Sequence, residues 1–268
     1  MRPTDRRSAL PPLAATLAAL LLATVAISPV DGARKPRPTP TPTPAPTATP
    51  TPPGGDPTAT SITWSGLTWT IKRSTSAVGP GPNIFSAANV WVDANGYLHL
   101  RISKDAKGRW TSAEIVGPNF GYGTYAFELG SRVDALDPNA VLGLFTWSDL
   151  PDYAYREIDI EFARWGWAGD PTNGQYVVQP WDAANHLERF TTPPTVPQTH
   201  RFAWREGRID WSSDASGSPI ASYAYAGADV PVPGGDVRPR LNLWLYGGKA
   251  PATGQSVEVV IRSFTWTP

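Results

Sequence analysis

Residues 154–167 read AYREIDIEFARWGW, and at their centre three acids alternate with large apolar residues. Side chains of a β-strand point to its two faces in turn, so Glu157, Asp159 and Glu161 should share one face. The apolar residues between and after them should point the other way, into a core. Such alternation is typical of a strand with one buried face. The segment therefore predicts a strand whose outer face carries three carboxyls.

The three acids need an explanation because like charges on one face of a sheet destabilise it. No Lys or Arg alternates with them. We interpret them as a functional cluster; a calcium site and a merely solvated face are the alternatives. Strand geometry puts the Cα atoms of Glu157 and Glu161 about 13 Å apart, and side chains that lean together bring their carboxyls to roughly 5–6 Å. That separation is typical of a retaining glycosidase. Asp159 can hydrogen-bond one glutamate and raise proton affinities nearby.

Beyond residue 60 the chain reads as an all-β protein. Helix signals are nearly absent, and short runs rich in Val, Ile, Tyr, Trp and Phe recur between Gly, Pro, Asn and Asp clusters. Tight turns are expected at 93–96 and 205–207. So many short strands predict an antiparallel β-sandwich or jelly roll. The candidate strands are 66–73, 90–103, 112–117, 123–131, 140–148, 156–163, 175–181, 200–213, 240–247 and 257–266.

Composition excludes several classes of protein. There is no cysteine, so disulfides, thiolate catalysis and Cys-type zinc sites are excluded. The three histidines show no metal-binding spacing, and we expect neither a metal nor a cofactor. Residues 1–56 hold six of the 23 basic residues and three of the 23 acidic ones, so the remainder is slightly negative. Without a basic stripe there, nucleic acid is not an expected partner.

The N-terminal part differs in composition from the rest. Residues 1–7 contain three Arg, and residues 8–30 form an uncharged run rich in Ala and Leu. Such a run indicates a signal peptide, and its 23 residues are also enough to tether the chain to a membrane. We therefore expect residues 1–33 to be a signal peptide or membrane anchor. Residues 34–60 should form an extended Pro/Thr-rich linker, because alternating Pro and Thr cannot pack a core. Residues 61–268 should form the folded domain.

The segment EIDIEF, residues 157–162, resembles the active-site strand of glycoside hydrolase family 16, most closely its lichenase- and laminarinase-like members. The segments SAEIVGPNFGYGTYAFEL, AVLGLFTWSD, HRFAWREGRIDWSSD and PRLNLWLYGG are also similar to family segments and follow in the family order. The resemblance spans roughly residues 62–268 and implies a concanavalin A-like jelly roll. It implies that Glu157 is the nucleophile, Asp159 its helper and Glu161 the general acid/base. Lichenase-type members usually carry Asn where this chain has Val177, so the resemblance does not name the sugar.

Aromatic and amide side chains are the candidates for binding the substrate. Asn242 and Trp244 share one face of the predicted strand 240–247, opposite three leucines. A polar Asn needs partners if it is buried, which favours a cleft face. Gln175 and Gln179 likewise share one face of a neighbouring run.

Other rings and loop residues are weaker candidates. Alternation places Tyr153 and Tyr155 on the acid face. Two residues of the loop NHLERF, His186 and Arg189, can line a subsite. For any one aromatic ring, packing is as good an explanation as sugar binding. The candidate platforms are Trp147, Tyr155, Trp165, Trp167, Tyr176 and Trp181.

Taken together, the patterns and the family resemblance predict a secreted, monomeric endo-glycosidase that cleaves a β-linked, β-glucan-like polysaccharide by a retaining double displacement. A membrane tether through residues 8–30 is compatible with this location. Three alternatives stay open. They are a transglycosylase with the same catalytic residues, a non-catalytic carbohydrate-binding domain, and a calcium-stabilised wall or adhesion protein that uses the acids as ligands.

Overall fold

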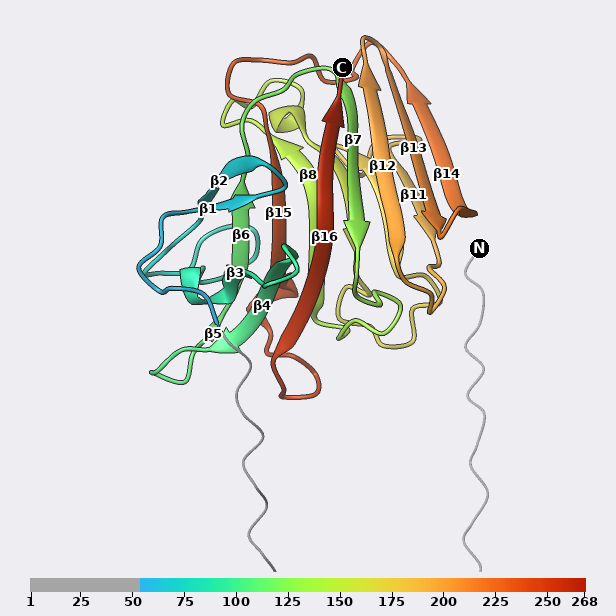
Figure 1. Cartoon of the computed structure of the whole chain (residues 1–268). Coiled ribbons are helices and arrows are strands. Elements are labelled where there is room, and N and C mark those ends of the chain that lie inside the picture. Colours follow the sequence, from blue (N-terminus) through green and yellow to red (C-terminus); the bar gives the residue numbers. More distant parts are fainter. Residues whose placement is uncertain (1–53) are drawn as a thin grey trace, which may run out of the picture. The chain divides into compact units, whose positions relative to one another are not determined.

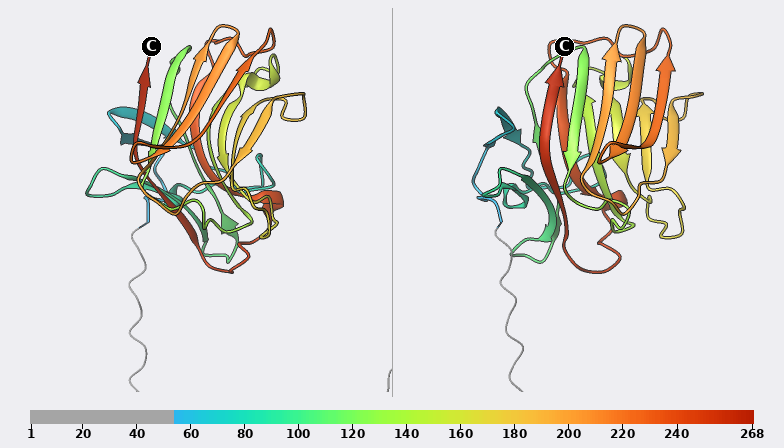
Figure 2. Two further views of the ribbon diagram at one scale, coloured as in Figure 1. Left: turned by 90° about the vertical axis from the view of Figure 1, so that its right-hand side faces the viewer. Right: turned by 45° about the vertical axis from the view of Figure 1, so that its right-hand side comes forward.

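The computed structural model describes residues 54–268, and almost all of their regular structure is β-strand. The strands form two antiparallel sheets that pack face to face (Figures 1 and 2). The antiparallel sandwich predicted from the sequence is confirmed. The expected signal peptide or anchor and most of the expected linker lie outside the described residues. Within residues 54–268, no helix is long and apolar enough to cross a membrane.

The first sheet carries the acid strand β9 between β8 and β10. Its order is β1 (Ser61–Trp64), β2 (Leu67–Ile71), β6 (Ala113–Val116), β15 (Arg238–Leu245), β8 (Ala140–Trp147), β9 (Ile158–Phe162), β10 (Gly174–Val178) and β11 (Leu187–Phe190).

The second sheet covers one face of the first. Its order is β14 (Ser218–Ala226), β13 (Arg208–Ala215), β12 (Gln198–Arg205), β7 (Gly123–Leu129), β16 (Val257–Thr267), β4 (Leu98–Lys104) and β3 (Val90–Val92), and β5 (Trp110–Thr111) pairs with β4. Three short turns complete the regular structure: Ala87–Asn89, Ala154–Arg156 and Tyr246–Gly248.

The core between the sheets is built from alternate residues of the strands. Ile158, Ile160 and Phe162 of β9 are fully buried in it. From the second sheet, Tyr125 and Phe202 stack with ring centroids 4.8 Å apart. Burying a large apolar side chain contributes about 1.5–3 kcal/mol, so this alternation fixes which face of β9 turns outward.

Polar contacts also cross the core and join the two sheets. Tyr176 of β10 donates its hydroxyl to Ser213 Oγ of β13 (2.6 Å), and that oxygen also contacts His200 Nδ1 (2.7 Å). Trp211 Nε1 of β13 donates to the backbone oxygen of Asp159 (3.1 Å). Buried polar groups need partners of this kind. The contacts tie the acid strand to the second sheet.

Most predicted strands are present, and the expected turns at 93–96 and 205–207 connect β3 to β4 and β12 to β13. Four strands were not predicted: β1, β5, β11 and β14. The prediction that NHLERF is a loop is wrong, because β11 pairs with β10 over four residues. The edge strand β14, SPIASYAYA, lacks a strong apolar pattern because much of it faces solvent.

Residues 55–60 contact the sandwich although their composition resembles the linker. The amide of Gly55 donates to the backbone oxygen of Ala88 (2.9 Å). A Cβ added at Gly55 would lie 1.9 Å from the backbone oxygen of Val90, so only glycine allows this close approach. The amide of Ile71 extends the contact by donating to the oxygen of residue 60 (2.8 Å).

Candidate active site

The outer face of β9 lines a cavity of about 930 Å³. Asp159 and Glu161 line it from the strand, and Glu157 does so from the position just before the strand begins. Asp159 is only 2% exposed, while the two glutamates keep part of their surface open. The structure thus brings together the three acids that the sequence singled out.

The strands beside β9 complete the floor of the cavity. Gly143 of β8 lies opposite Glu161. On the other side, β10 places Gln175 opposite Glu161 and Val177 opposite Asp159. Val177 is fully buried. It gives Asp159 an apolar neighbour where an amide would offer a hydrogen bond.

Burial raises the pKa of all three carboxyls, and repulsion between carboxylates adds to the rise at Glu157 and Asp159. Burial is the largest cause at each, and it raises the pKa of Glu157 to about 8 and the pKa of Glu161 to about 7. The charge of Glu161 adds to the rise at Glu157. Burial and the charges of both glutamates raise the pKa of Asp159 well above its usual range. The cluster therefore retains protons near neutral pH, as a general acid requires.

Asp159 is hydrogen-bonded to Glu157, and this contact lowers the pKa of Glu157 while it raises the pKa of Asp159. The contact therefore favours the proton on Asp159 and the ionised form of Glu157. Gln179 Nε2 donates to the other side of this pair, at Asp159 Oδ2 (3.2 Å). Gln179 is itself held by the backbone amide of Trp181, which donates to Gln179 Oε1 (2.9 Å).

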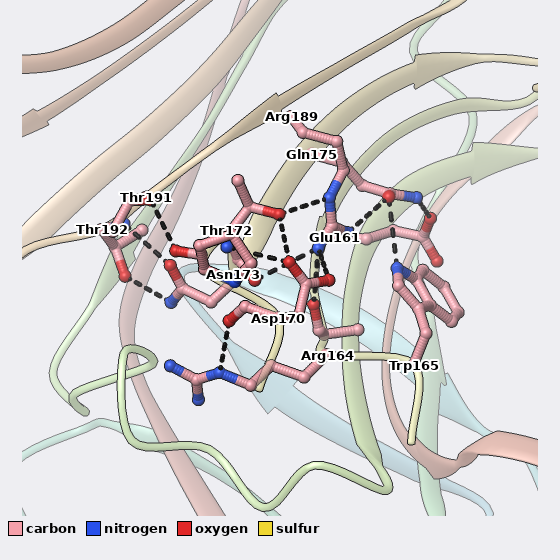
Figure 3. Close-up of polar contacts among 12 residues, drawn as sticks. Glu161, Arg164, Trp165, Asp170, Thr172, Asn173, Gln175, Arg189, Thr191 and Thr192 are labelled. Atoms are coloured by element: carbon pink, nitrogen blue, oxygen red, sulfur yellow. Dashed lines mark hydrogen bonds and ion pairs between the residues drawn. The ribbon is translucent and has the colours of Figure 1, made fainter. Parts of the chain in front are cut away.

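Glu161 has a different set of partners, drawn in Figure 3. Gln175 Nε2 donates to Glu161 Oε2 (2.7 Å). Gln175 Oε1 accepts from Arg189 Nη1 (2.8 Å) and from Trp165 Nε1 (3.2 Å). Arg189 forms an ion pair with Asp170, in the loop between β9 and β10. The amide and the guanidinium favour the ionised form of Glu161, so they oppose the effect of burial on its pKa.

A second polar group lines the cavity from β6 and β15. Glu114, 1% exposed, accepts from Lys72 Nζ (2.9 Å) and from Arg240 Nη1 (3.2 Å). Asn242 Nδ2 lies 3.5 Å from Glu114 Oε2. Among the described residues, Asn242 Oδ1 and Arg240 Nε have no hydrogen-bond partner. Both atoms are buried in the wall of the cavity.

Aromatic rings border the cavity. Trp147 stacks on Tyr155 with ring centroids 4.5 Å apart and planes at 5°. Trp165 meets Trp244 edge to face at 6.2 Å. Trp181 lines the cavity and is 61% exposed. Exposed rings of this kind offer an apolar face to a sugar ring.

Solved structures with the same fold include several glucanases. The β-glucanase of Bacillus licheniformis matches with a TM-score of 0.59 and 20% sequence identity, over 79% of this chain and 99% of the other. A β-1,3-1,4-glucanase (lichenase) from a mouse hindgut metagenome matches with a TM-score of 0.56 and 24% identity, over 75% and 92%. The chain has the glucanase fold.

A third structure with the glucanase fold carries a different description. It is an immunostimulatory antigen and pseudo β-1,3-glucanase of Mycobacterium tuberculosis, with a TM-score of 0.53 and 23% identity over 75% of this chain and 91% of the other. No family model and no curated protein sequence matches the chain. At these identities the likeness concerns the fold.

The prediction that Tyr176 binds substrate is wrong. Gln175 and Val177, on either side of it, point to the face of the first sheet that carries the carboxyls. Alternation along β10 therefore turns Tyr176 to the opposite face, into the core of the glucanase fold. The ring is fully buried, and its hydroxyl bonds to Ser213 of the opposite sheet. The cavity is on the other side of the strand.

The expectation that alternation places Tyr153 and Tyr155 on the acid face is also wrong. β9 begins at Ile158, and residues 153–156 all have positive φ values, between 48° and 64°. The chain therefore makes a left-handed turn just before Glu157. Tyr155 does not line the cavity but reaches its border by stacking on Trp147.

The remaining candidates differ in whether they line the cavity. Trp165 and Arg189 line the cavity, whereas Trp167 is 63% exposed outside it. His186 is buried away from it, with Nε2 2.8 Å from the Tyr225 hydroxyl. The predicted substrate-binding residues that line the cavity are Trp147, Gln179, Trp181, Asn242 and Trp244.

Sequence reasoning missed several residues that line the cavity of the glucanase fold. Glu114 carried a weak signal, as a single acid in the otherwise apolar strand run 112–117. Arg240 carried none, because it reaches Glu114 only after β6 and β15 pair across 126 positions of sequence. The other missed lining residues are Lys72, Val78, Gly79, Pro80, Gly143, Phe145, Asp149, Asp170, Leu187 and Tyr246.

No metal centre is visible in the part of the chain that the structure describes. Residues 54–268 contain no group of three or more His, Cys, Asp or Glu side chains placed to hold an ion. The carboxyls of Glu157, Asp159 and Glu161 are instead engaged with one another and with amides.

Proposed function

We propose that this protein is a retaining endo-β-glycosidase that hydrolyses a β-glucan-like polysaccharide. The observation that carries the proposal is the position of Glu157, Asp159 and Glu161 on one face of the acid strand, inside one cavity and with different partners. Two carboxyls of unlike environment are what glycoside hydrolysis requires. The glucanase fold supports the same reaction class by analogy.

In the first step Glu161 is protonated and Glu157 is ionised. The Glu157 carboxylate attacks the anomeric carbon as the bond to the glycosidic oxygen breaks, and Glu161 gives its proton to that oxygen. A glycosyl ester on Glu157 results, and the leaving chain departs with a new hydroxyl. Asp159, which holds a proton, donates to Glu157 and stabilises its charge before the attack.

In the second step Glu161 is the base. It takes a proton from a water molecule whose oxygen attacks the anomeric carbon, and the bond to Glu157 breaks. The anomeric configuration is inverted twice and so retained. Asp159 again donates to Glu157 as the carboxylate reforms. A sugar hydroxyl in place of water would give transglycosylation.

The protonation order of the resting site runs against these two roles. The pKa of Glu157 is raised to about 8 and that of Glu161 to about 7, so the empty site favours the ionised form at Glu161. The assignment of Glu157 as nucleophile rests on the family resemblance and on the proton that Asp159 donates to it. A bound sugar that displaces water from the cavity changes both environments.

A reducing-sugar assay on β-1,3-, β-1,4- and mixed-linkage glucans, galactan and xyloglucan tests the function. We expect cleavage of at least one glucan by the wild type. Glu157→Gln and Glu161→Gln should each lose activity by a factor of about 10³ or more while keeping the fold, because an amide can neither attack nor exchange a proton. A variant that stays within a few-fold of wild type would refute the role of its residue.

A second candidate function is carbohydrate binding without hydrolysis. The description of one structure of this fold as a pseudo-glucanase favours it. Affinity electrophoresis in the same glucans decides between the two: retardation without any product would establish a binding protein. An increase in chain length, followed by mass spectrometry, would instead identify a transglycosylase.

We also propose that the protein acts outside the cell and as a monomer. The charged start, the apolar run of residues 8–30 and the Pro/Thr-rich stretch that follows support export and a spacer. N-terminal sequencing of the exported protein would show whether the apolar run is removed. Light scattering would give the mass in solution.

A further inference from the structure

Three neighbouring strands present one continuous row of polar side chains. Gln175 of β10 is the register partner of Glu161 on β9 and of Arg189 on β11. Register partners project from the same face of a sheet. The carboxyl, the amide and the guanidinium therefore form a line that starts at the proposed acid/base and ends at the edge strand, as Figure 3 shows.

The amide of Gln175 can adopt only one orientation. Its Oε1 accepts from Arg189 Nη1 (2.8 Å) and Trp165 Nε1 (3.2 Å), and both of these groups are donors only. A flipped amide would set its NH₂ group against two donors and its oxygen against Glu161. Gln175 is 5% exposed, so water cannot replace the lost partners. Its Nε2 must therefore point at Glu161.

Arg189 is itself fixed in place. Its Nε donates to Thr172 Oγ1 (2.8 Å), and its Nη2 contacts both Asp170 Oδ2 and the Thr172 backbone oxygen (3.2 Å). The N–H groups of the planar guanidinium thus donate to the loop between β9 and β10 and to Gln175 (Figure 3). The loop, the edge strand and the amide hold one another.

We propose that Arg189 is a positioning residue, which locks the amide of Gln175 so that Gln175 holds the Glu161 carboxyl in place for proton transfer. The inference rests on the proposed function of that carboxyl. A group that gives a proton in one step and takes one in the next works best when its two forms are balanced near the working pH. Burial favours the protonated form of Glu161, while the amide N–H and the guanidinium favour the ionised form.

The charged groups around Glu161 come from its own segment and from β11. Glu157 and Asp159 lie on its own segment, and Arg189 faces it from β11 with Asp170 as counter-ion. From β8 the facing residue is Gly143, which has no side chain. Within residues 54–268, Arg189 is the cation whose charge acts on Glu161.

The first test needs no activity. Protein labelled with ¹³C at the glutamate side-chain carboxyls is titrated by NMR, and the Glu161 signal is assigned from its loss in Glu161→Gln. In Arg189→Met the midpoint of the Glu161 titration should move upward by about one pH unit. Arg189→Lys keeps a charge and should move it less. Arg201→Met is the matched control. This variant loses an ion pair of the same kind, between Arg201 and Asp214 (2.8 Å), on the second sheet.

The second test asks whether Arg189 acts through Gln175. Arg189→Met and Gln175→Leu should each lower kcat on a glucan by about tenfold or more, and the double variant should be no worse than Gln175→Leu. The first step on a dinitrophenyl glycoside, whose leaving group needs no proton, should be nearly unchanged. The alkaline limb of the pH–rate profile should move upward in Arg189→Met.

The outcomes separate this inference from the proposed function. An unchanged Glu161 titration in Arg189→Met, or losses that multiply in the double variant, would overturn the positioning role. If the wild type cleaves no polysaccharide, the function fails, while the NMR titration still decides whether Arg189 governs Glu161. If Arg189→Met does not fold, Arg189→Lys and Gln175→Leu carry the same comparison.

Discussion

Gly143 of β8 lies directly opposite Glu161 of β9, so the proposed acid/base has no side chain beside it on that flank. The space beside Glu161 is limited by the side chain of Asn242. A Cβ added at Gly143 would lie 2.5 Å from Asn242 Oδ1, the buried acceptor that has no partner among the described residues. The glycine therefore leaves room for the Asn242 side chain beside Glu161.

We expect Gly143→Ala to impair the enzyme without unfolding it. The new methyl group forces Asn242 to move and narrows the floor next to Glu161. A displacement of this size at a reacting centre lowers kcat/KM by about tenfold or more. Steady-state kinetics on the preferred glucan measure the loss. Gly235→Ala is the control, since a Cβ there meets no atom within 4 Å; equal kinetics for the two variants would contradict the prediction.

The two glutamates should respond differently to an added nucleophile. In Glu157→Ala the acid survives and a space opens beside the anomeric carbon, so azide should restore cleavage of an activated substrate with inverted configuration. In Glu161→Ala the nucleophile survives, so azide should attack the glycosyl-enzyme and give the product with retained configuration.

NMR of the products follows the configuration. The wild type should retain it. If the two azide products appear in the opposite variants, the roles of Glu157 and Glu161 are exchanged. The pKa values of the empty site, higher at Glu157 than at Glu161, favour that exchange, so the experiment decides between the two assignments. Net inversion by the wild type would overturn the double displacement altogether.

Stability should fall as the pH rises through neutrality. The pKa values of Glu157 and Glu161 are about 8 and 7 in the folded protein, against about 4.3 in an unfolded chain. Between these limits the folded state holds protons that the unfolded chain has released, so the free energy of unfolding decreases with pH. The stabilising effect is fully present below about pH 4 and is lost as the pH rises through the folded pKa values.

Urea unfolding at pH 5, 6, 7 and 8 measures this slope. Glu161→Gln removes one of the groups, so its loss of stability over this range should be smaller than that of the wild type, by on the order of 1–3 kcal/mol. A wild-type stability that is constant or rises over this range would show that the carboxyls do not share the burial assigned to them.

The N-terminal limit of the folded domain can be tested with two shortened chains. Removing residues 1–53 should leave a folded and active domain. Removing residues 1–60 should lower the midpoint of thermal unfolding by several degrees, because it deletes the segment that includes Gly55 and its contact with Ala88. Differential scanning calorimetry compares the two. Identical midpoints would mean that residues 55–60 add nothing to the sandwich.

The alternation of side chains between the two faces of a β-strand explains how much of the site could be predicted from the sequence. It placed Glu157, Asp159 and Glu161 on one face, and the structure agrees. The same rule applied to β10 excludes Tyr176 from the cavity, because the lining residues Gln175 and Gln179 stand at odd positions and Tyr176 at an even one.

Two other features gave no usable signal. The left-handed turn at residues 153–156 contains no glycine, so nothing in its composition marks positive φ values. The contact of Arg240 with Glu114 depends on which strands become neighbours. Local patterns do not contain that information.

The hydrogen bond from Trp211 to the backbone oxygen of Asp159 joins the second sheet to the strand that carries the proposed catalytic carboxyls. A substitution that changes the size of the side chains packed around Trp211 would shift the carboxyls, although the substituted residue does not line the cavity. At Trp211 the packing of the sandwich and the placement of the carboxyls therefore depend on the same indole N–H.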